Sequence, residues 1–371
     1  MLKTTLGGRD LAQRPVPKYV IDFGERSEFD ARSYPLVFNI VLDRVKPARD
    51  ANRDRGIREN WWRFHRIRQE LRHALTGLDH YIATTETMKH RTFTMLETKI
   101  APDHSLVCVA SDEYPILGVL SSHIHTSWAV AAGSRLGVGN DPRYTRTVTF
   151  DPFPFPEPTD SVRAGIAESA ERLDAHRKSA IARDERVTMT GMYNVVAKLR
   201  SGEALTPTER TIHELAACGV LRDIHDELDA LVAQAYGWPW PMSETEILDR
   251  LVALHDVRVE EEKHGVIRWL RPEFQAPGHT VAAPPAELSL ASHTSSAVVG
   301  ADAIMPWPTE AVEQIGALKR LASAGAVSVD DAAARFNGAK REIVARHLET
   351  LDILGEVRVL ADGTYGAAAA A

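Results

Sequence analysis

The chain has 371 residues, 44% of them hydrophobic and 26% charged, with a formal net charge of −7. This composition excludes a disordered chain and predicts a packed globular protein of two or three domains, at roughly 150 residues per domain. No apolar run approaches the ~20 residues that a membrane-spanning helix needs. The start, MLKTTLGGRD, lacks an apolar signal core, and the only cysteines, Cys108 and Cys218, cannot build a disulfide framework. We therefore expect a cytoplasmic protein with no membrane partner.

The charge is distributed unevenly along the chain. Residues 1–150 hold 22 Lys+Arg against 17 Asp+Glu, whereas residues 151–371 hold 22 against 34. Within the basic part, residues 44–72 carry ten Lys+Arg, nine of them arginine, against four acids. Such a segment can neutralise phosphates, although a solvated helix surface with ion pairs is the commoner outcome. Trp61, Trp62 and Phe64 inside it either anchor the segment in a core or stack on bases.

The first 150 residues predict a mixture of strands and helices. Short runs of β-branched and aromatic residues indicate strands at 17–23, 79–84, 105–110 and 116–120. Apolar residues recur at helical spacing over 29–46 and 121–132. After DPFPFPEP, whose prolines can continue neither a helix nor a central strand, the pattern becomes helical.

The region after this proline-rich stretch predicts three long helices. They span residues 159–184, 206–236 and roughly 244–262. The second begins at a Thr-Pro cap and ends at Gly237, and the third begins at a capping box formed by Ser243 and Glu246.

Residues 276–305 are small, Pro-containing and almost uncharged, which is typical of a linker. Beyond them we expect helices at about 309–323, 329–336 and 339–354, closed by Gly355, and then a hairpin turning at Asp362 and Gly363. Three helices and a hairpin form the outline of a winged helix, which can read a DNA groove or serve protein contact.

The stretch LGVGNDPRYTRTVTFDPFPFP (136–156) superficially combines two methyltransferase signatures, a glycine pair and an Asp-Pro-Phe element. The fit fails for three reasons. Gly137 and Gly139 do not follow a hydrophobic strand, Asp151 is followed by only one proline, and about 12 residues separate the two elements where a Rossmann-like fold needs several βα units. We therefore expect no catalytic residue and no cofactor-binding residue in this chain.

Other chemistries are also poorly supported. His123 and His125, with His104 and Asp103, offer too few ligands at a diagnostic spacing for a metal, so a structural or phosphate-contacting role is favoured and no metal is expected. Neither a Gly-x-Ser-x-Gly element nor a Walker-type Gly-Lys-Ser/Thr element occurs.

Many short sequence segments of unusual composition occur in the same order in a known family. Residues 7–277 resemble the C-terminal half of MmeI-like type IIL restriction-modification enzymes, which are adenine-specific DNA methyltransferases with a fused nuclease. The matching segments include GRDLAQRP, YVIDFG, RVKPARDANR, RENWWRF, YIATTETMKHRTF, LGVLSSHIHTSWA, LGVGNDPRYTRT, TFDPFPFP, DAHRK, TGMYNV, IHDELDALVAQAYGWP and GVIRWLRPEFQAP. The resemblance begins downstream of the family's glycine and Asn-Pro-Pro-Tyr motifs.

The resemblance, together with the sequence patterns beyond residue 277, predicts an α+β chain in four parts. These are a mixed α/β target recognition domain (1–157), a helical C-terminal region (158–275), a linker (276–305) and a small winged-helix-like domain (306–371). The implied function is to read double-stranded DNA for a methyltransferase catalytic domain or subunit, which would bind S-adenosylmethionine and methylate adenine. The alternative is a protein-interaction or specificity subunit of a phage-defence complex, without DNA affinity of its own.

Ten basic residues are the candidates for DNA contact. Arg53, Arg55, Arg58, Arg63 and Arg66 are expected to hold phosphates. A subset of Lys89, Arg91, Arg135, Arg143 and Arg146 is expected to reach base edges. For each of them, a surface or interdomain ion pair is the competing interpretation.

Overall fold

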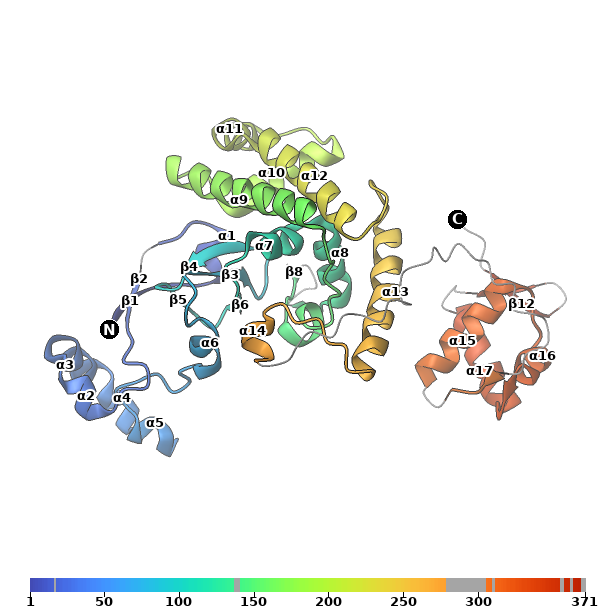
Figure 1. Cartoon of the computed structure of the whole chain (residues 1–371), viewed down its shortest axis with the longest axis horizontal. Helices are drawn as coiled ribbons and strands as arrows, with labels where there is room; N and C mark the ends of the chain where they lie inside the picture. Colours follow the sequence, from blue (N-terminus) through green and yellow to red (C-terminus); the bar gives the residue numbers. More distant parts are fainter. Residues whose placement is uncertain are drawn as a thin grey trace. The chain divides into compact units, whose positions relative to one another are not determined.

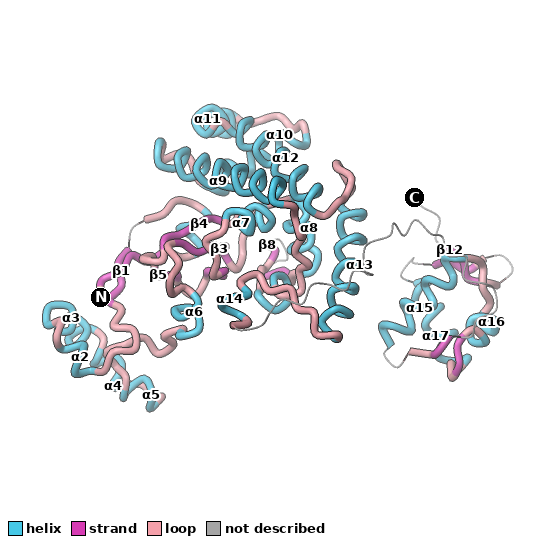
Figure 2. The backbone as a smooth tube through the Cα atoms, viewed as in Figure 1, coloured by secondary structure: helices cyan, strands magenta, loops and turns pink. Residues whose placement is uncertain are grey.

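The computed structural model divides the chain into two compact units, Met1–Ala282 and Ala283–Ala371, each of which is described by itself (Figure 1). The structure describes residues 1–16, 18–136, 141–277, 305–308, 311–353, 357–360 and 363–367. Helices predominate over strands in both units, as Figure 2 shows, and the strands form small sheets. The expected α+β class is confirmed.

The first unit begins with two small sheets. In one, β1 (Leu2–Leu6) pairs antiparallel with β2 (Lys18–Ile21) and parallel with β5 (Ala101–Pro102). In the other, β3 (His80–Thr85) lies between β4 (Thr94–Glu97) and β6 (Leu106–Val109), antiparallel to both. The predicted strands at 17–23, 79–84 and 105–110 are confirmed by β2, β3 and β6.

The central strand β3 is buried on both faces. Ile82 packs in one hydrophobic cluster with Phe93 and Leu117, and Tyr81 packs in another with Leu6 and Leu96. Side chains of a strand alternate between its two faces, so β3 joins two cores. A continuous apolar run in the sequence is the expected signature of such a strand.

The predicted strand at residues 116–120 is wrong. Residues Tyr114–Ser121 form helix α7, which begins with Pro115 in its first turn. Every residue from Ile116 to Ser121 is buried, so the run carries no alternation by which a strand could be told from a buried helix. The next helix, α8 (His123–Ala132), is capped by Ser122, whose hydroxyl accepts a hydrogen bond from the His125 amide. It matches the helix expected at 121–132.

Gly118 allows α7 to pack closely against the helical layer. A Cβ atom at this position would lie 2.5 Å from Ile166 Cγ2 and 3.2 Å from both Ala170 Cβ and Leu228 Cδ1. Replacing Gly118 by alanine is therefore expected to lower the free energy of unfolding by about 1–3 kcal/mol, measured by urea denaturation. Gly219→Ala is the control, because its nearest atom would be 3.7 Å away. Equal stability of the two variants would contradict the close packing.

Helices α9 to α13 form the helical layer that follows (Figure 1). They are α9 (Asp160–Arg183), α10 (Met189–Ser201), α11 (Pro207–Ala216), α12 (Cys218–Ala235) and α13 (Glu244–Lys263). The predicted helices at 159–184 and 244–262 are confirmed, including the Ser243–Glu246 capping box. The single helix predicted over 206–236 is instead two helices, because Ala217 adopts a left-handed conformation with φ 45°. No helix in the described part of the chain is long and apolar enough to cross a membrane.

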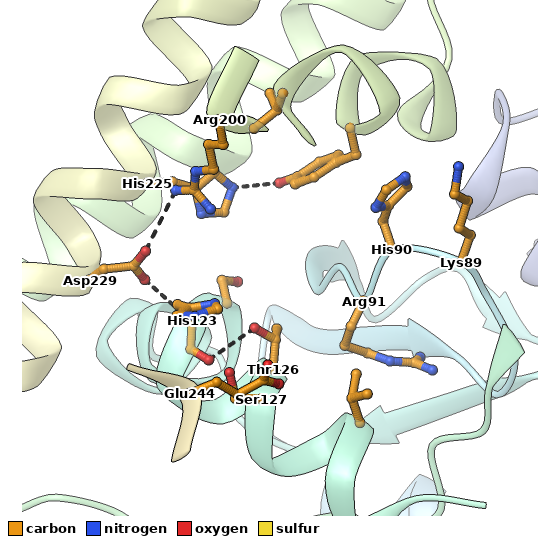
Figure 3. Close-up of a pocket in the computed structure, with 14 residues that line it drawn as sticks. Lys89, His90, Arg91, His123, Thr126, Ser127, Arg200, His225, Asp229 and Glu244 are labelled. Carbon is orange, nitrogen blue, oxygen red and sulfur yellow. Dashed lines mark hydrogen bonds and ion pairs between the residues drawn. The ribbon is translucent and has the colours of Figure 1, made fainter. Parts of the chain in front are cut away.

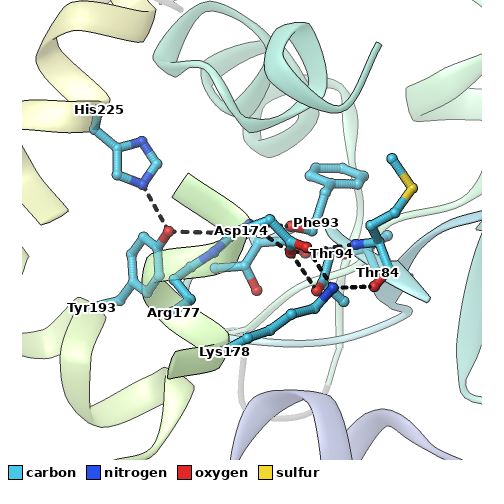
Figure 4. Close-up of polar contacts among 10 residues, drawn as sticks. Thr84, Phe93, Thr94, Asp174, Arg177, Lys178, Tyr193 and His225 are labelled. Carbon is cyan, nitrogen blue, oxygen red and sulfur yellow. Dashed lines mark hydrogen bonds and ion pairs between the residues drawn. The ribbon is translucent and has the colours of Figure 1, made fainter. Parts of the chain in front are cut away.

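A buried polar network attaches α9 to the edge of the β3–β4 hairpin (Figure 4). Asp174 accepts hydrogen bonds from Thr94 Oγ1 at 2.7 Å and from the Met95 amide at 3.4 Å. Arg177 donates to the Phe93 carbonyl at 2.7 Å and to the Tyr193 hydroxyl at 3.2 Å. Both charged side chains are almost completely buried. The helical layer and the sheet therefore share one interior.

A basic helical segment, residues 28–74, leads from β2 to β3. Its helices are α2 (Glu28–Arg32), α3 (Pro35–Arg44), α4 (Lys46–Asp50), α5 (Arg55–Glu59) and α6 (Gln69–Ala74). The single helix expected over 29–46 is interrupted before Pro35, because proline cannot supply the amide that a continuing helix needs. The remaining short helices of this unit are α1 (Gly8–Ala12) and α14 (Pro272–Gln275).

The second unit has its own core. Helices α15 (Ala311–Ala324), α16 (Val329–Ala334) and α17 (Arg341–Ile353) are followed by the antiparallel pair β11 (Val357–Val359) and β12 (Tyr365–Ala367). Leu318, Val344 and Leu348 lie in the centre of this core. The element order agrees with the predicted three helices and hairpin, and the winged-helix assignment itself stays a prediction. Most of the expected linker at 276–305 lies outside the described residues, as do Gly355 and Asp362.

Candidate nucleic-acid interface

The aromatic residues of the basic segment anchor it. Trp61 is only 5% exposed and packs edge-on against Phe38, with the ring centroids 5.4 Å apart. Trp62 is half-buried and donates its indole N–H to the Arg26 carbonyl at 2.9 Å. Of the three aromatics considered for base stacking, Phe64 is the one left exposed, at 44%. Burial of Trp61 holds this segment folded and leaves most of its arginines exposed.

An ion pair attaches the end of this segment to β2. Arg72 contacts Asp22 at 2.9 Å, and Lys3 lies 3.2 Å from the same carboxylate. Burial raises the pKa of Asp22, but the hydrogen bond and charge of Arg72 and the charge of Lys3 outweigh this effect, so the pKa is lowered. The carboxylate is thus held ionised, and it fixes α6 beside the first sheet.

The five candidate phosphate contacts lie together along the basic segment. Arg53 and Arg66 are exposed. Arg55 pairs with Glu59 one helical turn along α5 at 2.7 Å, and Arg58 donates to the carbonyls of Asn52 and Arg53. Arg63 donates to Asn60 Oδ1 and lies over the Trp62 ring. These partners are local and mostly at the surface, so they leave the segment a cationic face.

Two of the candidates for contact with base edges, Lys89 and Arg91, lie in the loop between β3 and β4. They differ sharply in solvent exposure. Lys89 is exposed and donates to Asn194 Oδ1 at 2.8 Å. Arg91 is only 8% exposed; it donates to Thr84 Oγ1 and the Pro142 carbonyl and lies over the Tyr144 ring. Burial lowers the pKa of Arg91 to about 10. Arg91 therefore has a structural role, because its buried guanidinium binds the loop together from inside. The expectation that a subset of the five residues reaches base edges stays a prediction.

The other three candidates lie beyond α8. Arg135 belongs to β7 (Arg135–Leu136), which pairs with β8 (Asp141–Pro142). Arg143 binds Glu86 through its Nε at 2.7 Å, which brings it to the β3–β4 loop. Arg146 begins the π-helix η1 (Arg146–Phe150) and pairs with Asp151 at 3.1 Å. The ion pair with Glu86 thus joins Arg143 to the β3–β4 loop that carries Lys89, separate along the chain from residues 53–66.

The proline-rich segment after η1 is packed into the protein. Phe153 is 4% exposed and lies 4.6 Å from the His125 ring, centroid to centroid. The Pro152 carbonyl faces His255 Nδ1, and the Pro154 carbonyl accepts the Tyr236 hydroxyl. An Asp-Pro-Phe element that acts on a flipped base needs its aromatic ring accessible for stacking. The burial of Phe153 does not fit such a role. Gly137 and Gly139 lie outside the described residues.

His125 of the segment SSHIHTSW is held in the protein interior by hydrogen bonds. His125 is fully buried, with Nδ1 2.8 Å from the Leu120 carbonyl and Nε2 3.1 Å from the Tyr144 hydroxyl. Burial lowers the pKa of His125 to about 3, so the ring is neutral. Among the residues that the structure describes, no group of His, Cys, Asp or Glu side chains could hold a metal ion.

Sequence reasoning missed a polar pocket between the β3–β4 loop and helices α8, α10 and α12 (Figure 3). Its volume is about 240 Å³, and Asp229, His225 and Arg200 contribute to its lining. The Asp229 carboxyl accepts the His123 amide at 2.6 Å, and burial raises its pKa to about 7. Lys89, Arg91 and His123 were singled out in the sequence, but Arg200, His225 and Asp229 lie more than 70 residues beyond His123, so no local pattern joined them.

Comparisons with known proteins agree with the family resemblance. Residues 1–157 match the family model of the MmeI target recognition domain. The chain is also similar to a solved structure of the type IIL restriction-modification enzyme MmeI in complex with DNA, with a TM-score of 0.52 and 19% sequence identity. The match covers 70% of this chain and 31% of that one, so this chain spans about a third of the length of MmeI. No protein of curated function matches the chain.

Proposed function

Since residues 1–157 form an MmeI-like target recognition domain, we propose that this chain recognises a short sequence of duplex DNA as part of a type IIL restriction-modification enzyme. The observation that carries the proposal is the match of residues 1–157 to the target recognition domain. The exposed arginines of residues 53–66 are suited to phosphates, since guanidinium groups bind phosphate oxygens in a bidentate manner. Lys89 and Arg143 stay candidates for base edges, and the Glu86–Arg143 hydrogen bond joins Arg143 to the loop that carries Lys89.

Methylation in this proposal belongs to a catalytic domain or subunit that binds S-adenosylmethionine and acts on adenine. Phe153 of the Asp-Pro-Phe element is buried and so is not accessible to a flipped base. The role of the described residues is to bind the duplex and set its register for the catalytic partner. No catalytic step is therefore assigned to a residue of this chain.

A contact with such a partner is supported by apolar residues on the basic segment. Phe29 and Leu36 are 83% and 84% exposed, and Ile40, one turn after Leu36 on α3, is 46% exposed. Exposed apolar residues that gather in one segment mark contact surfaces. This observation also favours the second candidate function, a specificity subunit of a phage-defence complex that binds its partner protein and not DNA.

Duplex binding by the full chain separates the two functions. With fluorescently labelled mixed-sequence duplexes, we expect affinity that falls linearly in log K against log salt concentration, with a slope of about −0.9 for each phosphate contact. Labelled S-adenosylmethionine should then yield methylated duplex when a methyltransferase catalytic domain of the same family is added. Tight binding to that domain without any salt-dependent duplex affinity would establish the subunit function instead.

A further inference from the structure

The pocket between α8, α10 and α12 combines features of a small-molecule site (Figure 3). Its volume of about 240 Å³ lies below the roughly 300–1,000 Å³ of sites for drug-sized ligands, so it suits a smaller molecule. Val130, Val196 and the ring of Tyr193 provide apolar walls. The other lining side chains are polar, and they come from the β3–β4 loop and from helices α7, α8, α10, α12 and α13.

Two buried serine hydroxyls in this pocket have no hydrogen-bond partner among the described residues. Ser121 is 5% exposed and Ser127 is 3% exposed, and both line the pocket. Buried polar groups are almost always hydrogen-bonded, because an unsatisfied one destabilises the fold. A hydroxyl can both donate and accept, so these serines suit a ligand that carries donors and acceptors together.

The interior of the pocket is unsuited to a phosphate group. Asp229 is 2% exposed and lies 3.6 Å from Arg200, too far for a direct hydrogen bond. His225 shares a hydrogen bond with the Tyr193 hydroxyl at 2.7 Å, and burial lowers its pKa to about 3, so it stays neutral. An anion placed here would meet a carboxyl group and a neutral imidazole. A neutral heterocycle would find donors and acceptors on several sides.

The mouth of the pocket is different, because exposed cations lie there. Lys89 is exposed on the β3–β4 loop, and the side chain of Arg200 is 39% exposed. Lys89 is held at the surface by Asn194, whose Oδ1 also lies 2.8 Å from His90 Nε2. Arg200 is also paired with Asp226 at 2.6 Å, and the acid Glu244 lines the pocket as well. A phosphate that stays in solvent can bind the Lys89 ammonium and share the Arg200 guanidinium with Asp226.

We propose that this pocket binds a single nucleotide, with its base against Ser121, Ser127 and Asp229 and its phosphate at Lys89 and Arg200. This goes beyond duplex recognition, because a base stacked inside a duplex cannot enter a pocket of this size. The nucleotide is either a free mononucleotide or an unstacked nucleotide of a nucleic acid. The chemistry of the site is the same for both sources.

Calorimetric titration of the full chain tests the proposal. The probes are the four ribonucleoside 5′-monophosphates, the corresponding nucleosides, ribose 5-phosphate and inorganic phosphate. At least one nucleotide is expected to bind more tightly than ribose 5-phosphate or inorganic phosphate. Lys89→Ala should weaken nucleotide binding and leave nucleoside binding unchanged. A duplex with one unpaired nucleotide, compared with its fully paired counterpart, reports on the nucleic-acid source.

Ser127→Ala separates a ligand-binding role from a structural one. Loss of one hydrogen bond should weaken nucleotide binding about 2–10-fold. The melting temperature without ligand should stay the same or rise, because an unsatisfied buried hydroxyl has been removed. Ser33→Ala, at an exposed helix end, is the matched control and should change neither quantity.

Two results would overturn the proposal. One is that neither the mononucleotides nor the duplex with an unpaired nucleotide shows binding that depends on Ser127. The other is that inorganic phosphate binds as tightly as every nucleotide, which would make the mouth of the pocket a phosphate site without a base. Binding of free mononucleotides, or a preference for the unpaired nucleotide that is abolished in Ser127→Ala, would support it and identify the source.

Discussion

Replacing Asp174 by alanine is expected to lower the free energy of unfolding of the first unit by about 3–5 kcal/mol. Asp174 accepts hydrogen bonds from Thr94 and the Met95 amide, and Lys178 Nζ contacts its second oxygen at 2.5 Å. Removing the carboxylate would leave the buried guanidinium of Arg177 without its neighbouring negative charge. Leaving a buried charge uncompensated is far more costly than breaking a surface ion pair.

Denaturation in urea, followed by circular dichroism, measures this effect. Glu168→Ala is the matched control, because Glu168 is an exposed acid on the same helix. Its effect should stay within about 0.5 kcal/mol. If the two variants were equally stable, the Asp174–Arg177 network would not be what joins α9 to the β3–β4 hairpin.

Combined replacement of Arg53, Arg55, Arg58 and Arg66 by alanine is expected to weaken duplex binding at low salt. If each arginine contacts one phosphate, the loss of affinity between 50 and 200 mM salt should become smaller by a factor on the order of 100, because counterion release costs about half a decade for each phosphate contact over that range. The slope of log K against log salt should become shallower by about 0.9 for each phosphate that the variant no longer neutralises. None of these four side chains belongs to the buried cluster around Trp61.

A variant with the same reduction of charge elsewhere provides the control. Arg163, Arg172, Arg186 and Arg222 lie on the helical layer or in the loop after α9, and each has a partly exposed side chain that is paired with an acid. Replacing these four by alanine should leave the salt slope unchanged if duplex contact is confined to the basic segment. An equal weakening of duplex binding in both variants would mean that net charge, and not this segment, governs binding.

Local sequence patterns predicted much of the secondary structure and none of its assembly. Ser243 with Glu246 and the Thr-Pro at 206–207 identified helix starts correctly, because capping is decided by residues a few positions apart. The run at 116–120 failed, because a segment buried on all sides has no periodicity. The break at Ala217 also escaped prediction, since the apolar spacing continues through it.

In the candidate site, too, local sequence patterns predicted some features and the tertiary structure decided the others. Composition located the basic segment, and the structure leaves its arginines at the surface, whereas Arg91 looked equivalent in sequence and lies inside the protein. Arg91 donates to the Pro142 carbonyl, 51 residues further along the chain, so no local pattern could have revealed its burial. The polar pocket was invisible for the same reason: Ser127, Arg200 and Asp229 have no relation in sequence.

The sequence by itself determined the α+β class, the charge asymmetry, the helix caps and the family resemblance, because these depend on neighbouring residues or on their order along the chain. Only the tertiary structure decided which cations face solvent, that the segment around Phe153 is packed, and that two unsatisfied serine hydroxyls share a pocket with Asp229. Burial and hydrogen-bond satisfaction are properties of groups brought together from distant positions. They fix the environment of a side chain, and that environment decides its chemistry.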